Sequence, residues 1–116
     1  MAEQLEKVKK EVEIFLKTNK QYLGVIIKDG SNVIVMGDIK RELLEILVDI
    51  TSFIASTFKQ LNVGSPRYFV AESDKGGVGY GKYGFDKVLI VYYRNTPLGT
   101  VMYDLKNLAQ KLANLT

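Results

Sequence analysis

The sequence contains no cysteine and no histidine. Without cysteine the chain can form no disulfide and offers no thiolate nucleophile, and without both residues the usual Cys/His zinc sites are excluded. The absence of histidine also removes imidazole acid–base catalysis. Any catalytic site would have to use Asp, Glu, Lys, Tyr or Ser alone, and no motif places a pair of carboxylates for such chemistry. We therefore expect no catalytic residues, no cofactor and no metal site.

Long apolar runs are also missing. The longest are short, such as VLIVYY at residues 88–93, whereas a membrane-spanning helix needs about 20 apolar residues. Charged side chains recur through the first ten residues, so the start of the chain lacks the apolar core of a signal peptide, and Ala2 stands where myristoylation requires glycine. The net charge is +3, and lysines and glutamates are interleaved along most of the chain, so no basic tail predicts nucleic-acid binding. We expect a cytoplasmic protein that neither inserts into membranes nor binds nucleic acid.

What the chain does contain is a clear periodic pattern. Residues 2–17 carry apolar side chains at the spacing of one helix face, supported by Glu and Lys four residues apart. Two β-branched runs then flank Asp29-Gly30, a dipeptide that favours a tight hairpin because the turn needs positive φ. We expect a helix over residues 2–17 and strands at 21–28 and 32–36.

The rest of the chain alternates in the same way. A long helix is expected over residues 39–61, with Asp38 as its N-cap and Pro66 preventing its resumption. A last helix is expected after Thr96, its cap, and Pro97, which suits the first helical position. Three strands are expected between these helices, at residues 65–73, 74–84 and 86–93. The order α-β-β-α-β-β-β-α predicts one α+β domain over residues 1–116.

A glycine-rich stretch, GGVGYGKYG at residues 76–84, contains a match to G-x-G-x-x-G. A phosphate-binding loop of that pattern must run into the N-terminus of a helix, but Gly84 is followed by a predicted strand. The alternation of Gly77, Gly79 and Gly81 instead predicts a strand with one bare face, which a helix or a large side chain can approach closely.

The long helix has more apolar surface than one sheet contact requires. Ile39, Leu43, Ile46, Ile50, Ile54 and Leu61 form one stripe that could lie on the sheet. A second group continues the apolar surface around the helix: Leu44, Leu47, Val48, Thr51, Ala55 and Phe58. We expect this second flank to form a symmetric dimer contact, with burial inside the chain or against a different protein as the alternatives.

This pattern resembles the roadblock family of dynein light chains. The resemblance covers nearly the whole chain, from the hairpin LGVIIKDGSNVIVMG through the long apolar helix to the closing NTPLGTVMYDLKNLAQKLANL. It implies a three-layer α/β/α sandwich around a five-stranded antiparallel sheet of order 2-1-5-4-3, with the long helix on one face and the terminal helices on the other. It also implies dimerisation through the long helices and the third strands, which adds Tyr68, Phe69 and Val70 to the candidate interface.

The resemblance further implies a function. Roadblock proteins are non-catalytic scaffolds and regulators of small Ras-like GTPases, and some stimulate GTP hydrolysis by the GTPase. We therefore expect a homodimer whose partner is a small GTPase. We do not expect a catalytic arginine finger at Arg41, Arg67 or Arg94, since each lies at the end of an expected element. A small-molecule or nucleotide sensor and a structural subunit of a larger complex are the alternatives.

Overall fold

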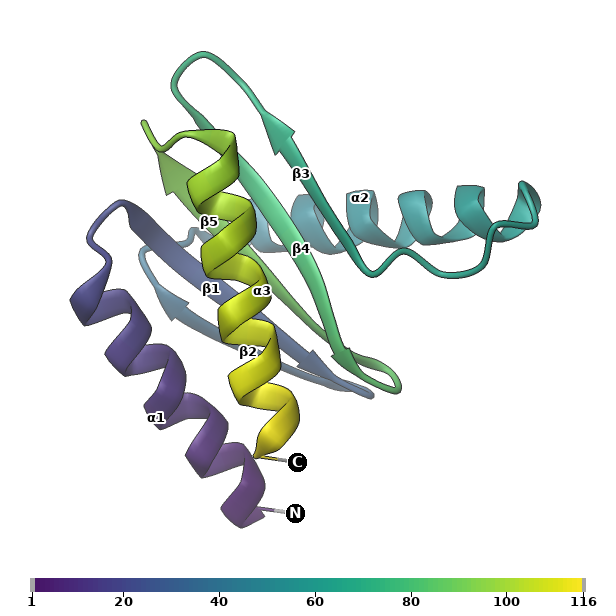
Figure 1. Cartoon of the computed structure of the whole chain (residues 1–116). Helices are drawn as coiled ribbons and strands as arrows, with labels where there is room; N and C mark the ends of the chain where they lie inside the picture. Colours follow the sequence, from purple (N-terminus) through teal and green to yellow (C-terminus); the bar gives the residue numbers. More distant parts are fainter. Residues whose placement is uncertain (1, 116) are drawn as a thin grey trace.

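The computed structural model describes residues 2–115 and contains the eight elements in the predicted order (Figure 1). The helices and strands are α1 (Ala2–Thr18), β1 (Tyr22–Asp29), β2 (Asn32–Gly37), α2 (Arg41–Gln60), β3 (Tyr68–Glu72), β4 (Gly76–Gly84), β5 (Lys87–Arg94) and α3 (Leu98–Asn114). The expected boundaries agree with these to within a few residues. In the part of the chain that is described, no helix is long and apolar enough to cross a bilayer.

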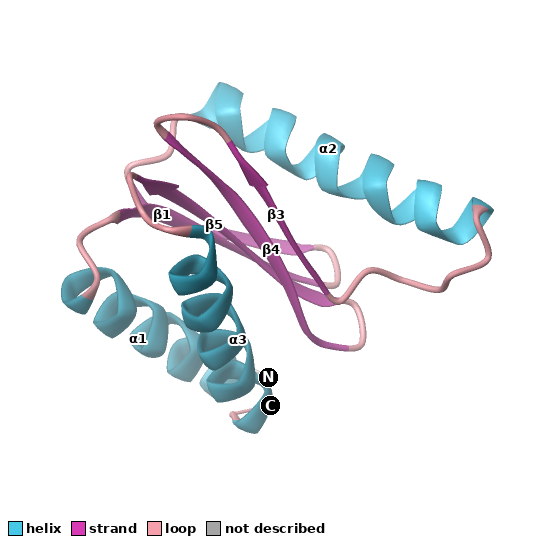
Figure 2. Cartoon of the chain, turned by 45° about the horizontal axis from the view of Figure 1, so that its top comes forward, coloured by secondary structure: helices cyan, strands magenta, loops and turns pink. Residues whose placement is uncertain are grey.

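The strands form one antiparallel sheet in the order β2-β1-β5-β4-β3. Helices α1 and α3 lie side by side on one face and α2 lies on the other (Figure 2). Strand β5 is central and buries both its faces, with Leu89 and Val91 on the side of α1 and α3 and Ile90 on the side of α2. This confirms the three-layer sandwich and the strand order of a roadblock fold.

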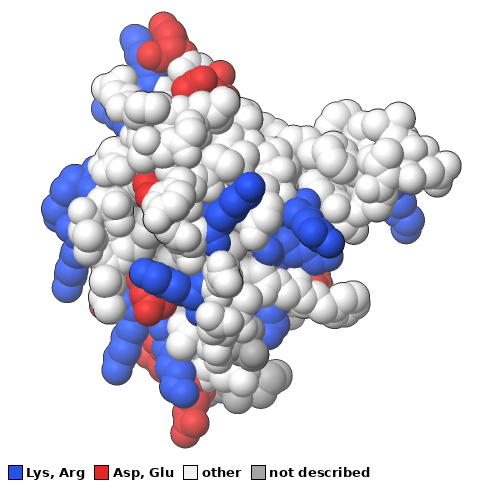
Figure 3. Space-filling model, viewed as in Figure 1, with Lys and Arg blue, Asp and Glu red and all other residues white. Residues whose placement is uncertain are grey.

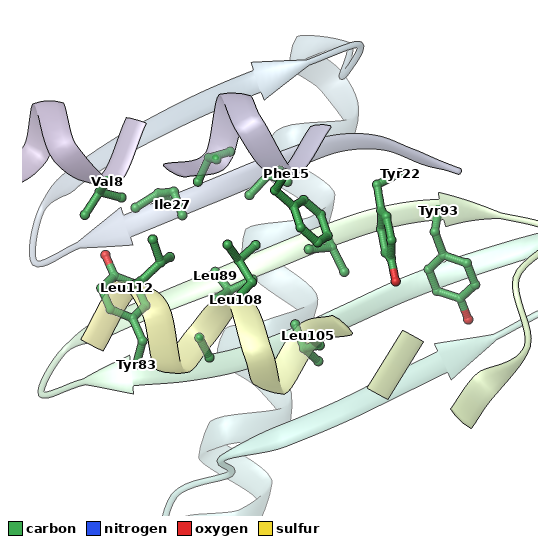
Figure 4. Close-up of a cluster of buried hydrophobic side chains, with 14 of the residues drawn as sticks. Val8, Phe15, Tyr22, Ile27, Tyr83, Leu89, Tyr93, Leu105, Leu108 and Leu112 are labelled. Atoms are coloured by element: carbon green, nitrogen blue, oxygen red, sulfur yellow. The ribbon is translucent and has the colours of Figure 1, made fainter. Parts of the chain in front are cut away.

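The larger core lies between the sheet and the pair α1 and α3 (Figure 4). Val8, Val12 and Phe15 from α1 meet the leucines of α3 over β1 and β5. At one end of this core the Tyr22 hydroxyl donates a hydrogen bond of 2.8 Å to the Asp104 carboxylate. Burial and that carboxylate both raise the pKa of Tyr22, so its hydroxyl remains a donor.

The glycine-rich stretch is strand β4, as predicted. An added Cβ at Gly79 would lie 3.0 Å from Val91 Cγ2 and 3.4 Å from Leu105 Cδ2, and one at Gly81 would lie 3.3 Å from Leu105 Cδ1. Helix α3 therefore approaches the backbone of β4 along its bare face. Because Gly84 leads through a two-residue turn into β5, no helix N-terminus follows the motif, and it does not have the geometry of a phosphate-binding loop.

The two predicted helix caps are wrong. Helix α2 begins after Lys40, and Asp38 is instead held by its backbone N–H, which donates to the Leu23 carbonyl at 2.7 Å. Helix α3 begins after Pro97, and the Thr96 hydroxyl turns back to donate to the Arg94 carbonyl at 2.8 Å. Neither helix has a side-chain hydrogen bond at its N-cap.

Candidate interaction surface

Helix α2 has one flank on the sheet and another in solvent. Leu47 and Thr51 are only 5% and 7% exposed. Leu47 packs in a cluster with Ile26, Tyr80 and Ile90 of the sheet. Leu47 and Thr51 therefore mark the side of α2 that contacts the sheet.

The sequence interpretation of the two flanks is wrong for several residues. Ile46 and Ile50, expected on the sheet-facing stripe, are 53% and 49% exposed. Leu47 and Thr51, expected in the dimer contact, are buried within the chain. The reason is that α2 is rotated about its own axis relative to the expected orientation. The centre of its apolar arc contacts the sheet, and one edge of the arc faces solvent.

The remaining candidates are divided between two places. On α2, the half-buried candidates are Leu44, Val48, Ala55 and Phe58. Val48 and Leu44 line a shallow hollow beside Val33 of β2. They therefore lie on the side of α2 that faces the β1–β2 hairpin.

On β3, all three candidates are half-buried. Phe69 points to the α2 side and stacks on Tyr80, with ring centroids 4.6 Å apart and the planes 10° from parallel. Tyr68 and Val70 point to the opposite side and pack on the core beneath α3. A contact along β3 would therefore involve both faces of the sheet.

A stripe of apolar side chains on α2 remains uncovered. Ile46, Ile50 and Phe53 are spaced four and three residues apart, which places them on one side of the helix. Phe53 is 73% exposed, although it is a large aromatic side chain. We call these three residues the apolar flank. Leu61 and Val63, just after the helix, are also exposed.

The apolar flank was not among the predicted dimer residues, although the sequence signal was present. Phe53 lies seven residues, about two helical turns, after Ile46, so both are on the same side of the helix, at the border of the polar arc. A helical wheel shows the width of an apolar arc but not its orientation in the fold, so this residue could not be assigned to a contact.

Helix α2 also projects past the edge of the sheet. Figures 1 and 2 both show its second half extending beyond β3 with no strand beneath it. In Figure 3 the projecting end, on the right, is mostly uncharged, whereas charges of both signs are spread over the side of α1 and α3. An apolar helix that overhangs an edge strand lacks a surface beneath it.

Strand β3 is itself an open edge. Within residues 2–115 it pairs with β4 on one side and with no strand on the other. The Arg67 carbonyl accepts from Lys82 N–H and Ser73 N–H donates to the Gly76 carbonyl, so alternate residues from 67 to 73 direct their backbone groups toward β4. The backbone groups of Tyr68, Val70 and Glu72 therefore point outward. An unpaired edge of this kind can accept another strand.

Few polar side chains are buried in the part of the chain that the structure describes. Apart from tyrosines, the buried polar residues within 2–115 are Thr51 and Thr96, and both donate to backbone carbonyls. No group of three Asp or Glu residues in that part of the chain is arranged to hold a metal ion.

Comparison with known proteins supports the fold. No protein-family model matches the sequence, and no curated protein sequence matches it. Among solved structures, the gliding protein MglB from Thermus thermophilus is similar over 97% of this chain and 90% of its own, with a TM-score of 0.77 and 17% identity. An MglB with a tetrameric arrangement is similar over 97% and 89%, with a TM-score of 0.75 and 16% identity.

A Roadblock/LC7 domain from Streptomyces avermitilis is similar over 81% of this chain and 84% of its own, with a TM-score of 0.65 and 15% identity. The structural neighbours are thus MglB and roadblock proteins over most of the chain. At these identities the likeness establishes the fold.

Proposed function

We propose that this chain is a non-catalytic, homodimeric platform that binds a small Ras-like GTPase. Two observations carry the proposal: the apolar flank of α2 is exposed, and α2 overhangs the unpaired edge of β3. The roadblock resemblance supplies the class of partner, and the structural likeness to MglB is consistent with it.

The apolar flank gives such a dimer a source of stability. Fully burying a side chain such as Ile or Phe contributes roughly 1.5–3 kcal/mol, and these three are about half exposed or more. Their burial would contribute about 1 kcal/mol or more each, and a two-fold axis would double the total. This gain is large enough to offset part of the entropy lost on association.

The overhang and the edge favour the same partner geometry. If β3 of a second copy paired with β3, the projecting half of each α2 would lie over the sheet of the other copy. The two α2 helices would then run side by side and cover both apolar flanks. The resulting ten-stranded sheet with paired helices would form a continuous surface for a GTPase.

The dimer is tested by Phe53→Glu, which places a charge in the proposed contact. The wild type is expected to have twice the 13.1 kDa mass of one chain by light scattering. The variant should raise the dimer Kd about 100-fold or more, because the change occurs on both sides of the axis. Ser56→Glu adds the same charge on the exposed polar arc of α2 and serves as the matched control.

Val48→Glu distinguishes the two sides of the helix. Val48 was predicted to lie in the dimer contact, but it is half-buried beside Val33. If Val48→Glu dissociates the dimer while Phe53→Glu leaves it intact, the contact uses the hairpin side of α2 and our assignment of the apolar flank is wrong. A monomeric wild type would contradict the homodimer itself.

The GTPase is tested separately, by recovering proteins from the native lysate on immobilised wild type. Recovery of a small GTPase that depends on a non-hydrolysable GTP analogue, and that is weaker with GDP, supports the proposal. Direct binding of nucleotide to the isolated protein would instead favour the sensor function. Recovery of a stable complex without a GTPase would favour the structural subunit.

A further inference from the structure

The outward edge of β3 has few ways to pair with a copy of itself. Tyr68, Val70 and Glu72 direct their backbone N–H and C=O groups away from β4. In an antiparallel pair, residues that face each other point their side chains to the same side of the sheet. A two-fold axis perpendicular to the sheet keeps each side chain on its own side of the sheet. Because only every second residue of β3 directs its backbone groups outward, the possible registers differ from one another in steps of two residues.

One of these registers uses the whole edge. With Val70 on the axis, Val70 faces Val70 of the second copy and Tyr68 faces its Glu72. All three outward residues then take part, and each facing pair exchanges two hydrogen bonds. A shift in one direction would bring Glu72 opposite Pro66, which has no N–H to donate. A shift in the other would bring Tyr68 opposite Asp74, which lies beyond the end of the strand.

The charges beside the edge favour the same register. Lys106 of α3 lies with its Nζ 5.6 Å from the centre of the Tyr68 ring, so an ammonium group is held at the edge on the α3 side. Glu72 is exposed at the opposite end of β3, and its side chain shares the α3 side with Tyr68 and Val70. When Glu72 of the second copy faces Tyr68, its carboxylate comes next to Lys106.

We propose that two copies of this chain pair their β3 strands about a two-fold axis at Val70, and that Lys106 of each copy forms an ion pair with Glu72 of the other. The inference rests on the homodimer proposed above and specifies its register. It also explains why the second copy is the preferred partner. The edge carries a cation at one end and an anion at the other, so it is complementary to itself when reversed.

The ion pair is tested by exchanging its charges. Lys106→Glu alone sets two carboxylates against each other at both contacts of the dimer, and Glu72→Lys alone sets two ammonium groups together at both. Each single variant should raise the dimer Kd about tenfold at low salt, since exposed ion pairs are individually weak.

When the two variants are mixed, one contact of the mixed dimer joins Lys106 with Glu72, and the other joins the two substituted residues, whose charges are exchanged. Both contacts are then attractive, so a mixed dimer should form with near wild-type affinity. If both variants dimerise like the wild type, or if mixing restores nothing, the ion pair is refuted.

The register is tested by single cysteine variants, which are unambiguous because the chain has no cysteine of its own. Facing residues of a hydrogen-bonded pair have Cα atoms about 5.5 Å apart, within the range for a disulfide. Under mild oxidation Val70→Cys should crosslink to itself in preference to Phe69→Cys and Ala71→Cys. Preferential crosslinking at 69 or 71 would indicate a shifted register, and no crosslinking in a dimeric protein would place the contact elsewhere. Both outcomes overturn the inference while leaving the homodimer intact, whereas a monomeric wild type would overturn both.

Discussion

The bare face of β4 allows a graded test of how closely its neighbours approach. The perturbation is the replacement of Gly77, Gly79 or Gly81 by alanine, one at a time. At Gly77 the added Cβ would overlap the Ala71 carbonyl oxygen and lie 2.6 Å from the Tyr93 hydroxyl oxygen. The closest neighbour is 3.0 Å away at Gly79 and 3.3 Å away at Gly81. The structure therefore ranks the three positions by available space.

The magnitudes follow from two opposing effects. Alanine in an extended backbone gains roughly 0.4–1 kcal/mol because it restricts the unfolded chain, whereas overpacking costs about 1–3 kcal/mol or more. At Gly77 the obstacle is backbone of the paired strand β3, which cannot move without weakening the ladder, so the net loss should be about 2 kcal/mol or more. At Gly79 it is Val91, buried in the central strand, and a net loss of about 1 kcal/mol is expected. At Gly81 the neighbours are side-chain ends of Leu105 and half-buried Tyr68, so the net change should be near zero.

The assay is urea unfolding followed by far-UV circular dichroism, with all variants at one protomer concentration because association contributes to stability. Gly77→Ala should have the lowest midpoint and Gly81→Ala the highest of the three. Gly77→Ala unfolding at the same urea concentration as Gly81→Ala would refute the close packing of β4. Gly79→Val should be more destabilised than Gly79→Ala. Adding GTP to the wild type should not shift its midpoint, since the glycines do not form a phosphate loop.

Two further predictions concern the buried tyrosines. Within the described residues the Tyr93 hydroxyl is buried without a hydrogen-bond partner, so Tyr93→Phe should leave the free energy of unfolding unchanged or raise it by about 1 kcal/mol. Tyr22→Phe removes the donor to the Asp104 carboxylate and should lower the free energy of unfolding by about 1 kcal/mol. The reverse order in urea unfolding would contradict both assignments. Burial raises the pKa of Tyr83 to about 12 and also raises that of Tyr80. Since an unfolded tyrosine ionises near pH 10, the folded chain keeps protons that the unfolded chain loses above that pH, and stability should fall by about 1.4 kcal/mol per pH unit between roughly pH 10 and 12 for Tyr83 alone. Unfolding midpoints that do not change from pH 9 to pH 11 would refute this.

The parts of the fold that could be predicted from sequence are those set by local geometry. Asp29-Gly30 fixes a hairpin because Gly30 adopts a φ of +60°, a value that few other residues tolerate. The alternation of glycines in β4 and the apolar run of β5 each depend only on the period of a strand. These signals need no knowledge of which elements meet, and all three are confirmed.

The orientation of α2 could not be predicted because it depends on what the sheet presents. Ile26, Tyr80 and Ile90 form an apolar surface that must be covered, and Leu47 lies over it. The helix contains enough apolar positions for several rotations about its axis, so its own sequence does not select one. The same excess explains why the exposed flank was missed: Phe53 is uncovered only because the helix is rotated toward Leu47.

The charges at the β3 edge have two physical explanations, and they predict different behaviour. Exposed charges on an edge strand prevent unwanted strand pairing, and in that role Glu72 and a lysine at the same position are equivalent. If Glu72 and Lys106 only protect the edge, Glu72→Lys should therefore leave the mass in solution unchanged. If they join two copies, the sign of each charge matters, and only the mixture of Glu72→Lys with Lys106→Glu restores both contacts. The distinction rests on sign and not on the presence of charge, which is why the mixed dimer separates a protected edge from a self-complementary one.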